Sequence, residues 1–291
     1  MFGNNKTVRL TVVSGLTMLA AGCATAPCEQ PVAAAPAPSA STTGGLPALL
    51  SEGTVIKQSA ADWAKFTIEN YEVINNVWNK NAASGPYNQE IFIKEDKDGN
   101  QVFGWRWRGK GGNVLAYPEV NIGAKPWDPP PSLKSDFPFA VGAKDIVVDF
   151  DVTLKASGRY NMAFELWVVK ALPPTQATIS KEIMIWNHNS GMTPQGSYSG
   201  TIEVGGVKYD AYIRAVHGDE SGANANKWSY MAFVAQTSVF KGSLPLKPFI
   251  DFLVQKGALS SKDYIANLEW GNEVIEGEGV AEIRRFRVKA Q

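Results

Sequence analysis

Residues 180–186 have the sequence Ser-Lys-Glu-Ile-Met-Ile-Trp, and this stretch decides the fold class of the chain. Isoleucine and tryptophan favour the pleated surface of a β-strand. Alternate side chains of a strand point to opposite faces, so Glu182, Met184 and Trp186 share one face, and Ile183 and Ile185 the other. An ionised carboxylate is rarely buried without a partner, so Glu182 would be out of place in an apolar core. We therefore expect one face of this strand in the core and the other in a cleft.

The face that carries the carboxylate has the chemistry of a sugar-binding cleft. The C–H faces of a sugar ring stack on an indole ring such as that of Trp186. A carboxylate at the same depth, here Glu182, can attack or protonate a glycosidic bond. The chain has nine tryptophans in 291 residues, which also favours carbohydrate binding, with a tryptophan-rich core as the alternative explanation.

Strand patterns with turn residues between them follow one another along the chain. Two of them, at residues 90–94 and 101–107, flank the hairpin signal Asp98-Gly-Asn. Further strands are predicted at residues 145–154, 160–169, 199–204, 207–215, 228–236, 264–273 and 279–288. One helix is predicted at residues 246–256 from its apolar spacing. The pattern predicts an all-β fold, a β-jelly roll sandwich of two antiparallel sheets with a concave substrate cleft and the helix on the convex side.

The N-terminal part predicts export rather than folded structure. Lys6 and Arg9 precede an apolar segment that is too short to span a bilayer, as in a signal peptide. Leu19-Ala-Ala-Gly-Cys23 resembles a bacterial lipobox, which makes Cys23 a lipid attachment site; a plain signal peptidase site is the alternative. A Pro-, Ala- and Ser-rich tether follows. We therefore expect a lipoprotein-type signal peptide at residues 1–22, the tether at 23–48 and one jelly-roll domain at 49–291.

Charge, cysteine and histidine content limit the partners. The 28 basic residues balance the 28 acidic residues, so we expect no nucleic-acid binding. His188 and His217 are too few and too far apart for a metal site, and no dinucleotide or P-loop motif is present, so we expect no metal and no cofactor. If Cys23 carries lipid, the remaining Cys28 has no disulfide partner in the chain. We expect a monomeric outer-membrane lipoprotein that faces the periplasm or the cell surface, or otherwise a secreted protein.

Several motifs resemble those of family-12 glycoside hydrolases. Glu182-Ile-Met-Ile-Trp, followed by a loop that ends in Pro194-Gln-Gly, resembles the segment that carries the family's nucleophile. Asn75-Asn-Val-Trp78 resembles its early Asn-x-Trp motif. Three further motifs follow in the family's order: Trp105-Arg-Trp107 with Ala116-Tyr117-Pro118, then the segment from Asn161 to Trp167, then Gly271-Asn-Glu273. The resemblance covers roughly residues 66 to 288 and implies a jelly-roll hydrolase that cuts β-1,4-glucans internally; family-11 xylanases are similar in fold but have another motif.

The resemblance assigns the chemistry to three carboxylates. Glu182 would be the nucleophile and Glu273 the acid/base, with the pKa of Glu273 raised while Glu182 stays ionised. Glu165 would be an auxiliary acid beside the nucleophile, where the family usually has aspartate. The alternatives for the acid/base are Glu269, Glu276 and Glu278.

The resemblance also implies a set of sugar contacts. The predicted aromatic platforms are Trp78, Trp105, Trp107 and Trp186, and the predicted polar and neighbouring contacts are Asn76, Tyr117, Asn161, Met184 and Pro194. Trp105 and Trp107 have the same parity in their strand, so the alternative is that one or two of these tryptophans face the core. Residues 187–196, rich in turn-forming types, are predicted to form a loop beside the cleft.

Two other functions stay open at this point. A non-catalytic carbohydrate-binding envelope lipoprotein would keep the sandwich and the tryptophans but would need no pair of carboxylates. A structural envelope lipoprotein would need only the tether and the sandwich. Which glucan is preferred depends on loop contacts that the sequence does not reveal.

Overall fold

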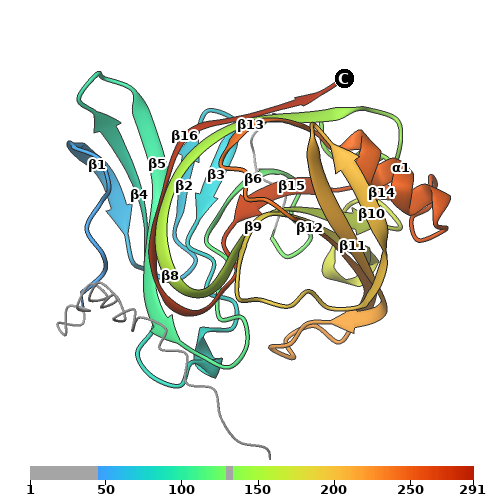
Figure 1. The fold of residues 1–291 in the computed structure, drawn as a ribbon, viewed down its shortest axis with the longest axis horizontal. Coiled ribbons are helices and arrows are strands. Elements are labelled where there is room, and N and C mark those ends of the chain that lie inside the picture. The colour runs from blue at the N-terminus through green and yellow to red at the C-terminus, as the bar shows by residue number, and fades with distance from the viewer. Residues whose placement is uncertain (1–44, 129–133) are drawn as a thin grey trace, which may run out of the picture. The chain divides into compact units, whose positions relative to one another are not determined.

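The computed structural model describes residues 45–128 and 134–291, and the regular secondary structure of this part of the chain consists mostly of strands (Figure 1). The strands are β1 Gly53–Ser59, β2 Lys65–Ile68, β3 Tyr71–Ile74, β4 Asn88–Asp96, β5 Gln101–Lys110, β6 Glu119–Gly123, β7 Phe139–Ala140, β8 Ile146–Val169, β9 Ile179–Ser190, β10 Ser197–Val204, β11 Val207–Gly218, β12 Lys227–Ala235, β13 Lys241–Pro245, β14 Tyr264–Ile265, β15 Asn267–Gly271 and β16 Val274–Ala290. The helices are the α-helix α1 Lys247–Gln255 and the 3-10 helices η1 Lys80–Ala82 and η2 Gln176–Thr178. None of the described residues forms a helix long and apolar enough to cross a bilayer. The predicted signal peptide, Cys23 and most of the tether lie outside the described residues.

The strands form two layers that share β8 and β16. One layer, here called the cleft layer, has the order β2-β3-β6-β15-β8-β9-β12-β11-β10. The other, here called the outer layer, contains β1, β4, β5, β16, the first half of β8 and β13. Figure 1 shows β8 and β16 curving together from one layer into the other. The predicted jelly-roll sandwich is confirmed, with one difference: β9 and β12 run parallel, whereas the other strand pairs are antiparallel.

Two glycines allow β8 and β16 to bend at the same place. Gly158 of β8 is paired with Gly277 of β16, and their φ angles are 104° and 105°. A Cβ atom at Gly158 would lie 2.2 Å from the carbonyl oxygen of Glu276, and one at Gly277 would lie 1.9 Å from that of Ser157. Only glycine fits both the positive φ and this close approach. We call this pair the crease.

The crease explains an error in the predicted strand boundaries. The sequence pattern predicted separate strands at residues 145–154 and 160–169, but the structure has one 24-residue strand, β8. Glycine usually weakens a strand, so the sequence around Gly158 does not indicate that one strand continues through it. In the structure the same glycine lets the strand continue while it changes layers.

The core fills the space between the two layers and follows the predicted alternation. Ile183 and Ile185 of β9 belong to the main apolar cluster, whereas Met184 and Trp186 belong to a separate cluster on the cleft side. In the main cluster, the ring of Trp270 stacks on that of Phe164 at 5.1 Å. Strand β9 therefore has one face in the core and one in the cleft.

The helix lies on the convex side, as predicted. Phe249 of α1 packs edge-on against Tyr209 of β11 and against Phe233 of β12, each at 4.9 Å between ring centroids. Both partners point away from the cleft. The helix therefore covers the end of the cleft layer rather than the outer layer.

The crease should be the position least tolerant of a side chain. We predict that Gly158→Ala and Gly277→Ala each lower the free energy of unfolding by about 2–4 kcal/mol, because strain at a positive φ adds to overlap with a carbonyl oxygen. Denaturant unfolding measures the change. Gly257→Ala is the matched control, since Gly257 has φ 69° and open space around its added Cβ, and should cost about 1 kcal/mol. Equal costs at all three positions would contradict a role for the close approach.

Candidate active site

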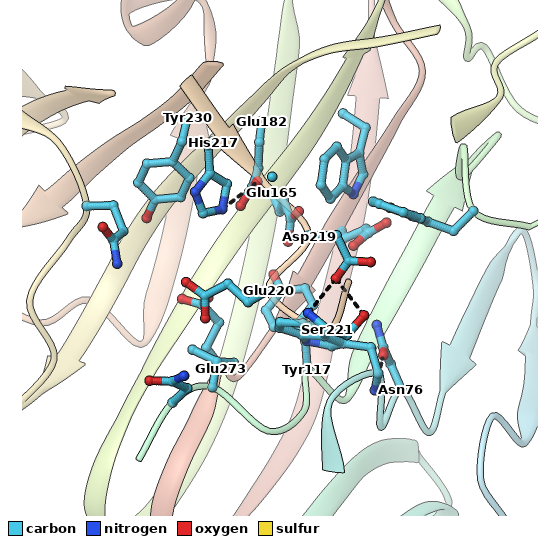
Figure 2. A pocket seen from close by; sticks show the side chains of 18 of the residues that line it. Asn76, Tyr117, Glu165, Glu182, His217, Asp219, Glu220, Ser221, Tyr230 and Glu273 are labelled. Carbon is cyan, nitrogen blue, oxygen red and sulfur yellow. Dashed lines mark hydrogen bonds and ion pairs between the residues drawn. The ribbon is translucent and has the colours of Figure 1, made fainter. Parts of the chain in front are cut away.

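A cavity of about 560 Å³ opens on the concave face of the cleft layer (Figure 2). Its walls combine carboxylates with aromatic rings from neighbouring strands and from the loop that joins β11 to β12. Among the described residues, no group of three or more His, Cys, Asp or Glu side chains is arranged to hold a metal ion. Four of the carboxylates that line the cavity are Glu165, Glu182, Glu269 and Glu273.

Strand register brings the predicted carboxylates together. Glu165 of β8 lies directly opposite Glu269 of β15 on one side and Met184 of β9 on the other. Glu182 of β9 lies opposite Trp167 of β8, two residues along from Glu165. Glu182 and Glu165 are therefore diagonal neighbours on the same face, close enough for their side chains to interact. Figure 2 shows them side by side in the cavity.

Glu182 is nearly buried and is held by a hydrogen bond from a tryptophan. The indole Nε1 of Trp228 donates to Oε2 of Glu182 at 2.6 Å. Burial raises the pKa of Glu182 to about 8, the hydrogen bond from Trp228 opposes this rise, and the negative charge of Glu273 adds to it. Burial thus raises the pKa of Glu182 as well as that of Glu273, and the ionised state of Glu182 stays a prediction.

A neutral histidine faces the same carboxylate oxygen. Nε2 of His217 lies 3.8 Å from Oε2 of Glu182, which is longer than a hydrogen bond. Burial lowers the pKa of His217 to about 4, so the ring is uncharged at neutral pH. Arg214, which can only donate, approaches Nδ1 of His217 at 3.3 Å. The neutral ring therefore carries its hydrogen on Nε2, pointing at Glu182.

Glu273 lies in the short connection between β15 and β16 and forms two hydrogen bonds with one asparagine. Nδ2 of Asn161 donates to Oε2 of Glu273, and the main-chain N–H of Glu273 donates to Oδ1 of Asn161 at 3.0 Å. Loss of water around the half-buried side chain raises the pKa of Glu273 to about 7, the bond from Asn161 opposes the rise, and the charge of Glu220 adds to it. Asn161, predicted as a sugar contact, is fully buried and holds the carboxyl group instead.

The alternative acid/base residues form ion pairs or hydrogen bonds with other side chains. Glu276 and Glu278 do not line the cavity, and they form ion pairs with Arg159 and Arg108 at 2.7 Å and 2.5 Å. Glu269 lines the cavity, but its Oε1 accepts a hydrogen bond from Asn267 and lies 3.1 Å from a lysine ammonium group. Glu273 is thus the carboxyl group best placed to exchange a proton in the cavity.

Glu165 belongs to a buried cluster of charges beneath the cavity. Burial, followed by the charges of Glu269 and Glu182, raises the pKa of Glu165 well above its ordinary value. The one cation in this cluster, among the described residues, is Lys125, whose Nζ lies 2.5 Å from Oε1 of Glu119 and 3.1 Å from Oε1 of Glu269. Burial and the neighbouring negative charges therefore favour the protonated form of Glu165. Its role as the auxiliary acid stays a prediction.

Four of the predicted sugar contacts line the cavity: Asn76, Trp78, Tyr117 and Trp186. Tyr117 is nearly buried, and its hydroxyl donates to the carbonyl oxygen of Ala163 at 2.8 Å. Asn76 donates from Nδ2 to Glu119. Trp78 is more exposed than the other three, which leaves its ring open to a ligand.

The assignment of Trp105 and Trp107 as sugar platforms is wrong. Both are fully buried between the layers and belong to the main core cluster. They lie on β5, a strand of the outer layer, so their shared face points into the core and cannot reach the cleft. Residue parity told us that the two rings share a face, but not which layer the strand belongs to.

Two smaller expectations also need correction. Met184 is 1 % exposed and packs beneath the cavity, and Pro194 does not line it, although its neighbours Thr193 and Gln195 do. The predicted loop at residues 187–196 is too long, since β9 continues to Ser190. Hydrogen bonds to β8 keep the polar end of β9 in the sheet despite its turn-forming residue types.

Sequence reasoning missed several aromatic residues of the cavity. Trp228 and Tyr230 alternate on one face of the predicted strand at residues 228–236, so period-two spacing could have found them. Trp127 and Trp228 pack edge-on with Trp167 at one end of the cavity, with ring centroids 5.3–5.8 Å apart. Trp63, 43 % exposed, also lines the cavity and has a positive φ of 61°. No spacing signal pointed to Trp63 or Trp127, because both lie outside the predicted strands.

The raised pKa of Glu182 makes stability depend on pH. Its neutral form is favoured in the folded state, so its contribution is present below about pH 4.5 and is lost as pH rises to about 8. We predict that Glu182→Gln, which removes this titration, melts at nearly the wild-type temperature at pH 4.5 but is the more stable protein at pH 8 by on the order of 2 kcal/mol. Thermal unfolding of both proteins across this range tests it. A difference that does not change with pH would contradict the prediction.

Comparisons with known proteins match most of this domain. The sequence profile of Glycosyl hydrolase family 12 matches residues 69–290. Endoglucanase S of Pectobacterium parmentieri is 29 % identical over 246 residues, which covers 82 % of this chain and 90 % of that protein. Xyloglucan-specific endo-beta-1,4-glucanase A of Emericella nidulans is 26 % identical over 244 residues, which covers 80 % and 91 %.

Solved structures agree with the sequence comparisons. The native family 12 xyloglucanase from Bacillus licheniformis superposes with a TM-score of 0.72 and 26 % identity, over 81 % of this chain and 100 % of that one. Endoglucanase cel12A from Rhodothermus marinus gives a TM-score of 0.64 and 26 % identity, over 81 % and 99 %. Fold, carboxylate-lined cavity and sequence profile agree, and the chain belongs to glycosyl hydrolase family 12.

Proposed function

We propose that this protein cuts internal β-1,4-glucosidic bonds of neutral β-glucans by a double displacement that retains the anomeric configuration. The observation that carries the proposal is the pair Glu182 and Glu273, which face one aromatic-lined cavity from neighbouring parts of the cleft layer. The names of the relatives, an endoglucanase and a xyloglucan-specific endo-β-1,4-glucanase, support β-1,4-glucan as the substrate class. Cellulose-type chains, mixed-linkage glucan and xyloglucan are the polymers to compare.

In the first step, a carboxylate oxygen of Glu182 forms a bond to the anomeric carbon while the glycosidic C–O bond breaks. Glu273 gives its proton to the departing oxygen. Trp228 occupies Oε2 of Glu182 with its N–H, which leaves Oε1 as the attacking atom. The hydrogen bond also favours the ionised form of Glu182.

In the second step, water attacks the anomeric carbon and the ester bond to Glu182 breaks. Glu273, now ionised, takes the proton of the water, and Glu182 leaves as a carboxylate. Burial raises the pKa of both carboxyl groups, and the charge of Glu273 further favours the protonated form of Glu182. The mechanism requires the arrangement in which Glu273 holds the proton and Glu182 is ionised. Glu165 lies diagonal to Glu182, and its raised pKa favours the protonated form that could donate a hydrogen bond to Glu182 when Glu182 departs.

The binding-only alternative explains less of the cavity. A carbohydrate-binding protein needs aromatic surfaces but gains nothing from burying carboxyl groups, which lowers its stability. The cavity buries Glu165, Glu182 and Glu269 and holds Glu273 with two hydrogen bonds. Glycoside hydrolysis requires such a pair of carboxyl groups, although burying them lowers the stability of the protein.

The stereochemistry of the first product tests the proposed mechanism. We predict that hydrolysis of a soluble β-1,4-glucan gives the β-anomer first, because two inversions at one carbon restore its configuration. Proton NMR during the first minutes of the reaction distinguishes the anomers before mutarotation mixes them. An α-anomer as the first product would rule out the glycosyl ester on Glu182.

Two variants assign the roles of the pair in the same experiment. Glu182→Ala should abolish hydrolysis of every substrate, because no bond to the anomeric carbon can form. Glu273→Ala should lose about 10²–10⁴-fold in kcat/KM on glucan, yet keep most of it on 2,4-dinitrophenyl cellobioside, whose leaving group needs no proton. Similar losses on both substrates in Glu273→Ala would argue against its role as the acid.

We also propose that the chain is exported and anchored through a lipid on Cys23, as the N-terminal sequence predicts. Ala24 follows this cysteine in place of the aspartate that commonly retains lipoproteins at the inner membrane, so we place the enzyme on the outer membrane. Cys23→Ala should move the protein from the membrane to the soluble fraction on cell fractionation. A variant that stays with the membrane would contradict the lipid anchor.

A further inference from the structure

A chain of hydrogen bonds runs from the core to the carboxyl group of Glu273. Nε1 of Trp105 donates to Oδ1 of Asn272 at 2.7 Å. Nδ2 of Asn272 donates to the main-chain oxygen of Asn161 at 2.6 Å, and Nδ2 of Asn161 donates to Oε2 of Glu273. The first three residues are fully buried. These hydrogen bonds therefore connect the outer layer with the cleft through three side chains that are closed to solvent.

Two N–H donors, the indole of Trp105 and the main-chain N–H of Glu273, fix the direction of the bonds in this chain. An indole nitrogen can only donate, so Asn272 must turn its oxygen toward Trp105 and its NH2 group toward Asn161. The main-chain N–H of Glu273 donates to Oδ1 of Asn161, so Nδ2 of Asn161 must face the carboxyl group. Neither amide can flip without losing two hydrogen bonds, and both bonds of Asn272 are buried. Glu273 thus always meets a donor on Oε2.

A neighbouring tryptophan shows that burial alone does not produce such a contact. Trp107 lies two residues along the same strand, β5, and is equally buried. Its Nε1 has no hydrogen-bond partner in the described part of the chain. Both rings fill the core, but only the N–H of Trp105 is connected to the cleft.

We propose that Trp105 and Asn272 are positioning residues that act through Asn161 to hold the acid/base carboxyl group in its working orientation. With Oε2 occupied by an amide donor, the proton of Glu273 sits on Oε1, the oxygen left to face the leaving group. The same donor favours the ionised form that must act as base in the second step. This inference rests on the proposed function, and it gives the buried Trp105 a role that does not require contact with sugar.

The test compares Trp105→Phe with Trp107→Phe on two substrates. Trp105→Phe should lower kcat/KM for β-glucan by about 10–100-fold, because a misdirected acid transfers its proton poorly. For 2,4-dinitrophenyl cellobioside, kcat/KM should change less than about threefold, since that bond breaks without the proton. Trp107→Phe, the matched control, should keep the wild-type ratio of the two values. Equal losses on both substrates in Trp105→Phe, or no loss on either, would overturn the proposal.

A measurement on the unmodified protein covers the case in which Trp105→Phe fails to fold. The indole ¹H–¹⁵N resonance of Trp105 should shift as pH passes through the pKa of Glu273 at about 7, and that of Trp107 should not. Glu182 and Glu220 also face Glu273, so Glu273→Gln is the control in which the shift should disappear. A Trp105 resonance that does not shift with this titration would overturn the proposed positioning role of Trp105. Wild-type protein that is inactive on both substrates would instead refute the proposed function. The NMR titration does not depend on turnover, so it tests the positioning role separately.

Discussion

The close approach of two backbones at Gly158 and Gly277 is the constraint on which the rest of the structure depends. Because neither residue has a side chain, β8 and β16 stay hydrogen-bonded while both pass from the outer layer into the cleft layer. The cleft exists because these strands bend rather than end. Asn161 follows the bend closely in β8, and Glu273 immediately precedes β16, so the same constraint brings the acid/base and its holder together.

The cleft brings several carboxyl groups close together, although burying such groups lowers the stability of the folded state. Five carboxyl groups lie on or beneath its floor near one lysine: Glu119, Glu165, Glu182, Glu269 and Glu273. Desolvation raises the pKa values of Glu119, Glu165, Glu182 and Glu273, which favours the protonated form of these groups in the folded state. The arrangement costs stability and supplies the mixture of protonated and ionised acids that glycoside hydrolysis uses.

Much of the fold and part of the site could be predicted because both depend on alternation along a strand. Period-two spacing placed Glu182 and Trp186 on one face, and it separated them from Ile183 and Ile185, as the clusters in the structure do. Spacing could not tell that Trp105 lies in the outer layer, because that depends on which strands pair. Spacing also could not predict β1, because its residues are mostly exposed and show no apolar alternation.

Other features of the site depend on depth and on distant parts of the chain. Lys125 comes from the segment after β6, and nothing in its sequence neighbourhood connects it with Glu269, which lies far along the chain. The pKa of Glu182 depends on how much water the surrounding rings remove, and strand parity does not measure that. The tautomer of His217 likewise follows from a contact with Arg214 that becomes visible only once β11 has formed.

The hydrogen bonds that hold Glu273 join residues that are remote in the sequence, and this has a consequence for the order of folding. Asn161 and Glu273 are separated by 112 positions, and Trp105 and Asn272 by 167. Contacts of such long range close large loops, so they form late and slowly compared with the hairpins of the same sheet. The acid/base is therefore completed only when the last long strand has added to both layers. A partly folded chain can bury tryptophans and form most of its hairpins while it is still unable to donate a proton, so the onset of catalysis marks the completed fold more strictly than secondary structure does.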